Sequence, residues 1–366
     1  MSSTQRRRFR QAPNFDERLI AGTAFEFEVL GSALTRGTTV SNDDNDKRLN
    51  DRRFRASFGC SSKQCAIAWI LVCDGWHDRP IGATKMRFLW ALLLLKSYDT
   101  ENNMAGTCHC DEKTFRKWAW FFILELSDRS GEVVSTKIQL TDDIYNRLSL
   151  SLSLILSLFC FYYLFIYFLS SSNKIIWENR YVDDIGNDCL ASVDGTDFAL
   201  AWGASDKRLS CYKFKGKPGL RYEVALCLRT GDIVWTSGPH TPGTVNDLQI
   251  FRFGLKYQLG YGERIEADDG YIGECPTYCK CPNGPDHLKD RELMNRLHRS
   301  RHETVNQRFK MFGCMKKHFR HDVKKHGQCF ECVVLLTQLS INEGPGLFHI
   351  EYDDLLDDFT ANLIFG

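Results

Sequence analysis

The chain lacks three features that would each have narrowed its function at once. Its 47 Lys and Arg residues nearly balance 46 Asp and Glu residues, so the net charge of +1 predicts no partner by itself. The basic N-terminus has no apolar stretch behind it, so we expect no secretory signal peptide. The cysteines match no common zinc-finger spacing. The distribution of charged and apolar residues along the chain is therefore the informative signal.

The 15 cysteines are spread along a chain without an export signal, which favours reduced thiols over a disulfide framework. Two cysteine clusters leave zinc binding open as an alternative, because zinc needs four converging ligands. The competing interpretation is that the second cluster opens a buried helix, "CFECVVLLTQLSI". The first cluster contains Cys275, Cys279 and Cys281, and the second contains His318, His321, His326, Cys329 and Cys332.

Residues 1–56 are predicted to form a largely disordered basic arm, because two Arg- and Lys-rich clusters flank the polar segment "TRGTTVSNDDND". Such an arm serves nuclear import or phosphate contact, or it is a solvated tail without a role. Residues 57–130 show apolar residues at helical spacing. A helix, a Gly-containing turn and a second helix that starts at Asp111 or Glu112 are typical of a helix-turn-helix, with Arg116 and Lys117 as DNA contacts.

Residues 131–173 form an apolar, low-complexity insertion that carries no charge from Leu148 to Asn173. Its segment 148–169 is long enough to span a membrane, which makes a membrane-anchored protein one alternative. A span would, however, place the flanking regions on opposite sides of a bilayer. The Leu-Ser alternation is also what a CT dinucleotide repeat encodes. A retained intron in the gene model is therefore the interpretation that we favour.

Residues 174–345 are predicted to form an α/β domain, followed by an acidic tail over 346–366. Runs rich in β-forming residues predict strands, and an amphipathic stretch behind a capping residue predicts a helix. Three strands, a helix, a strand and further helices are the element order of an RNase H-like domain, a mixed sheet flanked by helices. The predicted strands are 189–200, 221–229, 232–238 and 264–271, and the predicted helical segments are 246–259 and 289–319.

Three acidic residues are the candidate catalytic groups. Asp194 follows the apolar strand residues of "LASVD", Asp268 ends "RIEAD", and Glu303 lies on a basic helix, so all three can converge on one edge of a sheet. Carboxylates are ligands that Mg²⁺ and Mn²⁺ prefer, and two such ions can activate a water and stabilise a leaving oxygen. Asp197 and Asp269 are neighbouring alternatives. Acids that merely cap strand ends would give the same pattern.

Cations surround these acids, which suits a polyanionic substrate such as DNA. A solvated basic helix without a ligand would look similar. The candidate DNA-binding residues of this region are Lys213, Lys215, Lys217, Arg221, Arg299, Arg301, Arg308 and Lys310.

Five blocks in order, "SVDGTDF", "KFKGKPGLRYEVAL", "GPHTPGTVNDLQIFR", "ADDGYIG" and "RHETVNQRFKMF", resemble the DDE superfamily endonuclease domain of PIF/Harbinger-type transposases. The resemblance covers about residues 175–345, and Asp268 and Glu303 have a spacing found in many DDE enzymes. It implies an RNase H-like fold, a catalytic triad of Asp194, Asp268 and Glu303, and a two-metal site for Mg²⁺ or Mn²⁺.

The resemblance also implies cleavage of double-stranded DNA at transposon terminal repeats and transfer into a target site. A nuclear location, a helper DNA-binding protein and a homo-oligomer belong to the same expectation. On the basic helix, Asn306 and Gln307 would support Glu303, since they lie on its face. Helix capping accounts for Asn246 and Asp247. A catalytically inactive DNA-binding protein descended from a transposase is the main alternative.

Overall fold

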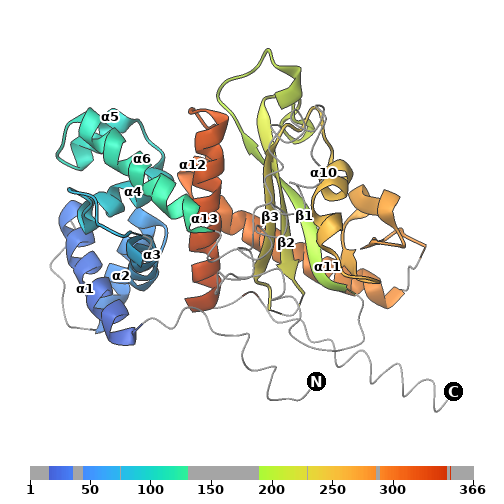
Figure 1. Ribbon diagram of the computed structural model, residues 1–366, viewed down its shortest axis with the longest axis horizontal. Coiled ribbons are helices and arrows are strands. Elements are labelled where there is room, and N and C mark those ends of the chain that lie inside the picture. Colours follow the sequence, from blue (N-terminus) through green and yellow to red (C-terminus); the bar gives the residue numbers. More distant parts are fainter. Residues whose placement is uncertain are drawn as a thin grey trace, which may run out of the picture.

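The computed structural model describes residues 16–35, 44–74, 76–130, 189–228, 230–285, 289–343 and 347. Within these ranges the chain is mixed α/β: a group of helices from the N-terminal half lies beside a five-stranded sheet with helices of its own (Figure 1). The apolar insertion predicted over 131–173 lies outside the described residues, as does the predicted acidic tail except for Leu347.

The N-terminal half is helical, and it begins earlier than the sequence predicts. Its helices are α1 (Glu17–Leu34), α2 (Asp44–Phe58), α3 (Ser62–Asp74), α4 (Lys85–Ser97), α5 (Glu101–Thr107) and α6 (Glu112–Asp128). The prediction of a disordered arm is therefore wrong for α1 and most of α2. Phe27, Phe54 and Phe58 are buried in the core. The favourable free energy of burying these rings offsets the conformational entropy lost when the two segments become ordered.

Side-chain caps set the starts of three of these helices. Thr84, Thr100 and Asp111 each accept a hydrogen bond from the backbone N–H three residues ahead, which satisfies a donor that the first helical turn leaves unpaired. The predicted start of the second basic helix at Asp111 or Glu112 is confirmed. The predicted Gly-containing turn is instead partly helical, because Gly106 lies in α5, and the connection from α5 to α6 runs through His109 (φ 51°).

The sheet has the strand order β3-β2-β1-β4-β5. The β1–β2 and β2–β3 pairs are antiparallel, whereas β1–β4 and β4–β5 are parallel. Four of the strands were predicted. The fifth, β5, has only two residues and gives no periodic signal in the sequence. The strands are β1 (Cys189–Ala199), β2 (Gly219–Cys227), β3 (Ile233–His240), β4 (Arg264–Glu266) and β5 (Cys279–Lys280).

Helices and short 3-10 turns complete this half. The predicted basic helix over 289–319 is divided at residues 310–312, and the predicted helix over 246–259 ends early and continues as a 3-10 turn. The α-helices are α10 (Asp247–Phe253), α11 (Lys289–Phe309), α12 (Gly313–Lys316) and α13 (Val323–Glu343). The 3-10 turns are η3 (Lys207–Leu209), η4 (Tyr212–Phe214), η5 (Leu255–Gln258) and η6 (Asp269–Glu274).

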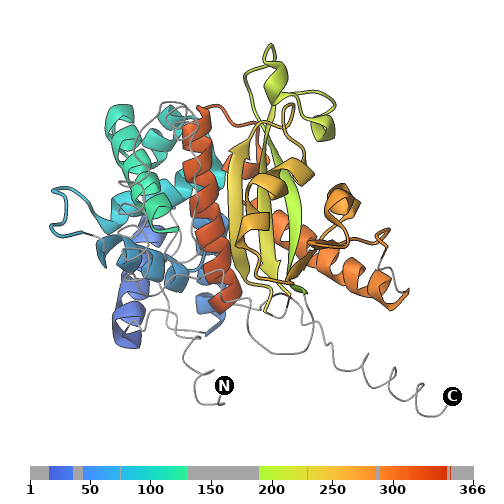
Figure 2. The same cartoon turned by 45° about the vertical axis from the view of Figure 1, so that its right-hand side comes forward.

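Helix α13 lies between the N-terminal helices and the sheet, as both views show (Figures 1 and 2). On one side the Cys332 thiol donates to the carbonyl of Ile123 in α6, at 3.2 Å. On the other side the backbone N–H of Ile233 in β3 donates to the Gln338 side chain, at 2.8 Å. One hydrophobic core runs through all three parts, so the two halves share buried surface instead of meeting at a polar boundary.

Candidate functional site

Asp194 and Asp268 lie side by side because of the sheet register. Strands β1 and β4 are parallel neighbours, and Ser192 pairs with Glu266. Two residues further along, beyond the end of β4, the same register brings Asp194 near Asp268. Burial, and then repulsion by the Asp268 carboxylate, raise the pKa of Asp194 to about 6. The structure thus brings together the two acids that the sequence selected.

The Asp268 side chain caps the turn that follows β4. It accepts a hydrogen bond from the backbone N–H of Gly270 at 2.9 Å, which fixes one oxygen at the start of η6. The other oxygen lies 3.9 Å from the Arg299 guanidinium of α11. Asp269 turns elsewhere and accepts two hydrogen bonds from Asn283. Of the two neighbouring acids, Asp268 is therefore the one that faces Asp194 and α11.

Asp247 is a third carboxyl group near this pair, and the sequence interpretation missed it. Helix capping accounts for Asn246, which caps α10, but not for Asp247. The Asp247 carboxylate lies over the backbone of Gly195, where a Cβ atom would meet its oxygen at 2.4 Å. Burial is the largest cause that raises the pKa of Asp247, and Asp268 contributes. A glycine directly after Asp194 was the signal that a side chain approaches there.

Glu303 lies on α11, which is fixed to the same face of β1 that carries Asp194. Ser192 and Asp194 point to one side of the strand, and the Ser192 hydroxyl lies 2.9 Å from Nε2 of buried His302. Glu303 follows directly and is exposed. Arg299, one turn earlier on its face, faces Asp268. Glu303 makes no hydrogen bond or ion pair among those found for the described residues.

The donor set at this site suits a hard divalent cation. The Asp268 carboxylate contributes to the raised pKa of Asp194, and a bound Mg²⁺ or Mn²⁺ would favour the ionised form of Asp194. Within the described ranges, no three His, Cys, Asp or Glu side chains lie close enough together to form a metal-binding group. Asp194 and Asp268 are the residues that fit an ion, and Glu303 would have to approach them.

The basic residues around the acids divide into two kinds. Lys213, on η4, is close enough to lower the pKa of Asp194 and is near Lys310. By contrast, Arg221 is held by Asp197, at 2.8 and 3.0 Å, and by Asp247, at 3.3 Å. Lys213, Lys215, Lys217 and Lys310 are all exposed, which is the surface position expected of phosphate contacts.

Two predicted contacts on α11 need correction. Arg301 is only 2% exposed and donates to the carbonyl oxygen of Leu228, so its side chain holds α11 to the sheet and does not take the exposed position that the prediction requires. Arg308 is half-buried, and burial lowers its pKa. The predicted supporting residue Gln307 is exposed and Asn306 is half-buried, while Val305, Phe309 and Phe312 are buried in the core.

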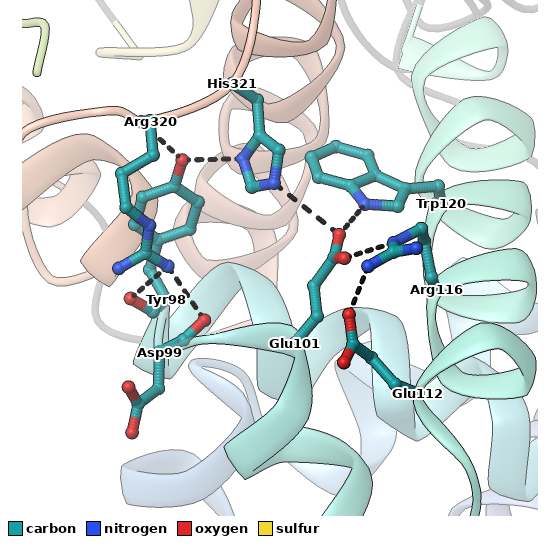
Figure 3. Close-up of polar contacts among 8 residues, drawn as sticks. All are labelled: Tyr98, Asp99, Glu101, Glu112, Arg116, Trp120, Arg320 and His321. Carbon is teal, nitrogen blue, oxygen red and sulfur yellow. Dashed lines mark hydrogen bonds and ion pairs between the residues drawn. The ribbon is translucent and has the colours of Figure 1, made fainter.

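In the helical half, Arg116 is not free to contact a phosphate. Its guanidinium lies between the carboxylates of Glu101 and Glu112 (Figure 3). Glu101 also accepts from the Trp120 indole at 2.8 Å and lies 3.5 Å from His321 of the second half. This network joins the two halves. Lys117 remains exposed, with its ammonium 5.2 Å from the Trp118 ring.

The second Cys and His cluster is divided among separate contacts. Cys329 and Cys332 are buried within α13, which confirms the buried-helix interpretation of this segment. The Cys329 side chain hydrogen-bonds that of Cys314. His326 is buried and its Nδ1 lies 2.7 Å from the Tyr222 hydroxyl, whereas His321 belongs to the Glu101 network.

Among the described residues, no single helix has the length and apolar character needed to cross a membrane; one bent pair, Arg48–Phe58 with Ser62–Asp74, meets those two criteria jointly. The candidate span at 148–169 lies outside the described residues.

Comparison with protein-family models, with curated proteins and with solved structures found no match for this chain.

Proposed function

We propose that this protein is a divalent-metal-dependent DNA endonuclease and strand transferase of the PIF/Harbinger DDE type, with an RNase H-like catalytic domain. The observation that carries the proposal is the register of β1 and β4, which sets Asp194 beside Asp268. The sequence blocks that resemble the DDE domain contain both acids. The element order of three strands, a helix, a strand and further helices agrees with the expected domain.

In this proposal Asp194 and Asp268 hold Mg²⁺ or Mn²⁺, and Glu303 completes the triad when α11 brings it near. The bound ions would supply activation of a water or a 3′-hydroxyl and stabilisation of the departing oxygen. The chain's own residues contribute by positioning the carboxylates and the phosphate backbone. Asp268 is oriented by the Gly270 N–H, and Lys213 places a positive charge beside the acids to attract the phosphate backbone.

The partners follow from the same proposal. Double-stranded DNA at terminal repeats and target sites is the substrate, the α5–α6 region acts as a helix-turn-helix reader, and the protein works in the nucleus. A helper DNA-binding protein and a homo-oligomer remain part of the expectation. Lys117 is the predicted α6 cation that is available for DNA, since Arg116 is engaged by two carboxylates.

A catalytically inactive DNA-binding protein is the second candidate, and one observation favours it. Arg299, not Glu303, is the α11 residue that lies against Asp268. A guanidinium in that position neutralises a carboxylate that a metal ion would otherwise use. Such a chain would bind DNA without metal-stimulated cleavage.

Nicking of supercoiled plasmid DNA with Mg²⁺ or Mn²⁺ tests the proposal. We expect Asp268→Asn to lower the rate of metal-dependent nicking by at least about a hundredfold, because a carboxylate that faces the reaction centre is lost. Asp269→Asn is the matched control, since that neighbouring acid binds Asn283 instead. Equal rates for the wild-type chain and Asp268→Asn would exclude the catalytic role. DNA binding without nicking by any of the three would favour the inactive alternative.

A further inference from the structure

Two cysteine side chains lie close together directly behind the loop that carries Asp268. Cys275 follows η6, and Cys281 follows β5. Both residues border the same turn, because a Cβ atom built on Gly284 would lie 3.4 Å from the Cys275 sulfur and 3.1 Å from the carbonyl oxygen of Cys281. The two side chains are close enough to interact with each other. The two thiols therefore lie near each other in the fold.

This pair differs in its access to solvent from two other close thiol pairs of the described residues. Cys60 with Cys65, and Cys314 with Cys329, are also close together, but both members of each pair are buried. Cys281 is buried as well, at 6% exposure, whereas Cys275 is only half-buried. A small solute can thus reach Cys275 first, whereas the Cys281 thiol lies in the interior.

The backbone around Cys281 is tied to the backbone around Asp268. The Ala267 N–H donates to the carbonyl of Lys280 at 3.0 Å. The Asn283 backbone and side-chain N–H groups donate to Asp269, at 3.0 and 2.8 Å. These hydrogen bonds join the residue before and the residue after Asp268 to the segment that carries Cys281. A movement of that segment is transmitted to the acid.

We propose that Cys275 and Cys281 form a redox modification site, in which a hydroperoxide oxidises the two thiols to a disulfide that displaces the Asp268 loop. The Cys275 sulfur attacks the peroxide oxygen and becomes a sulfenic acid, as the O–O bond breaks and one water leaves. The Cys281 sulfur then attacks the Cys275 sulfur and expels a second water. Two thiols and one hydrogen peroxide give one disulfide and two waters.

The covalent bond changes the loop more than it stabilises the fold. A disulfide needs an S–S distance of about 2.05 Å, so the two sulfurs must approach further and draw the Cys281 segment with them. The loop that it closes is very short, and chain-entropy stabilisation grows with loop length. A structural crosslink would join distant segments, whereas this one acts on a local segment beside a functional carboxylate.

The test uses the full chain, treated with hydrogen peroxide and then alkylated and mapped by mass spectrometry. We expect a Cys275–Cys281 linkage that a dithiol reductant reverses and that is lost in both Cys275→Ser and Cys281→Ser. Cys110→Ser removes a half-buried thiol elsewhere and should leave the linkage unchanged. Unreacted Cys275, a linkage to Cys279 or oxidation of Cys275 to a sulfinic acid without a linkage would each overturn the site.

Hydrogen exchange measures the displacement without relying on nuclease activity. We expect faster exchange of the backbone amides around Asp268 in the oxidised wild-type chain and in Cys110→Ser, but not in peroxide-treated Cys275→Ser. Unchanged exchange in an oxidised, linked chain would overturn the displacement.

The consequence for cleavage rests on the proposed function. A shift of Asp268 by an ångström should slow metal-dependent nicking by up to about a hundredfold, reversibly with reductant. A linkage with altered exchange in a chain that nicks in neither redox state would support the thiol site and count against the nuclease. Nicking that is insensitive to a formed linkage would contradict the link between the loop and catalysis.

Discussion

At the residue scale, Glu223 is a carboxyl group that the fold encloses beside the candidate site. It pairs with Gly195 across β1 and β2 and is 1% exposed. Burial raises the pKa of Glu223 to about 8, and the neighbouring polar groups of Trp235 and Tyr271 offset only part of that effect. The folded chain therefore holds this side chain as a neutral acid at pH 7.

This raised pKa predicts a dependence of stability on pH. Between the ordinary pKa of Glu, near 4.3, and about 8, the folded state keeps a proton that the unfolded state has lost. The stability contribution of Glu223 is present below that window and falls as pH rises through it, by at most about 1.4 kcal/mol per pH unit.

Glu223→Gln removes the ionisable group but keeps its shape. We expect the variant to gain stability relative to the wild-type chain as pH rises from 5 to 8, and the two curves to converge at the acidic end. Urea unfolding at a series of pH values measures this difference. A constant difference across the series would show that Glu223 ionises normally in the folded chain.

The residue scale also shows how far the sequence could predict the site. Asp194 and Asp268 were identified because each follows apolar residues of a predicted strand. In the structure Asp194 lies within β1 and Asp268 lies two residues after β4, and the strand register brings them together. Asp247 was missed because its position at a helix start has a local explanation. Arg301 was misassigned because its partner, the carbonyl of Leu228, is distant in sequence and is reached only in the folded chain. Local sequence patterns identify candidate site residues, but they do not show which of those side chains already bind other residues of the chain.

At the scale of elements, the start of α5 is joined to the segment that precedes α13. The Tyr98 hydroxyl accepts from the backbone N–H of Arg320 at 2.9 Å and lies 2.8 Å from Nδ1 of His321 (Figure 3). The Arg320 side chain donates to the carbonyls of Tyr98 and Asp99, at 3.3 and 2.8 Å. The orientation of the helical half relative to the sheet depends on these contacts.

Tyr98→Phe tests this junction. We expect a loss of about 1–3 kcal/mol in the free energy of unfolding. The Tyr98 side chain is only 1% exposed, so removing its hydroxyl leaves the buried hydrogen-bond partners of that hydroxyl unpaired. Tyr212→Phe is the matched control, since the Tyr212 side chain is 97% exposed. Urea unfolding at one pH measures both. An equal effect of the two substitutions would mean that the Tyr98 hydroxyl contributes nothing specific.

Elements were easier to predict where each one carries its own signal. Strands β1 to β4 and the start of α6 follow from periodicity and from a capping residue. Helices α1 and α2 were missed, because two basic clusters and the polar segment between them suggested a solvated arm. Their aromatic residues form a core only together with α3 and α4, and Gly31 permits the close approach of Phe54. The free energy gained by burying these aromatic residues is therefore a property of the assembled helices and not of either segment alone.

At the scale of the whole molecule, α13 makes the two halves one unit. Its residues contact α6 on one side and β3 on the other, within a single hydrophobic core. A substitution that destabilises α13 should therefore destabilise both the helical half and the sheet. This arrangement would also hold the proposed DNA-binding helices in a fixed place relative to the proposed catalytic sheet.

Leu335→Ala, in the middle of α13, tests this coupling. We expect a loss of about 2–5 kcal/mol, because the fully buried side chain leaves a cavity. The unfolding transitions measured by far-UV circular dichroism and by tryptophan fluorescence should shift together. Leu124→Ala, in the exposed face of α6, is the control and should change little. A shift in only one of the two signals would show that the halves unfold independently.

The sequence by itself determined the α/β class, most of the strands and the two neighbouring acids Asp194 and Asp268, because periodicity, turns and the residues that follow apolar strand segments are encoded locally. Only the tertiary structure decided that Asp247 lies beside them, that Arg116, Arg221 and Arg301 are already paired, and that the cysteines behind Asp268 lie close together. These features depend on which distant groups meet, and a contact between distant groups leaves no pattern in either segment.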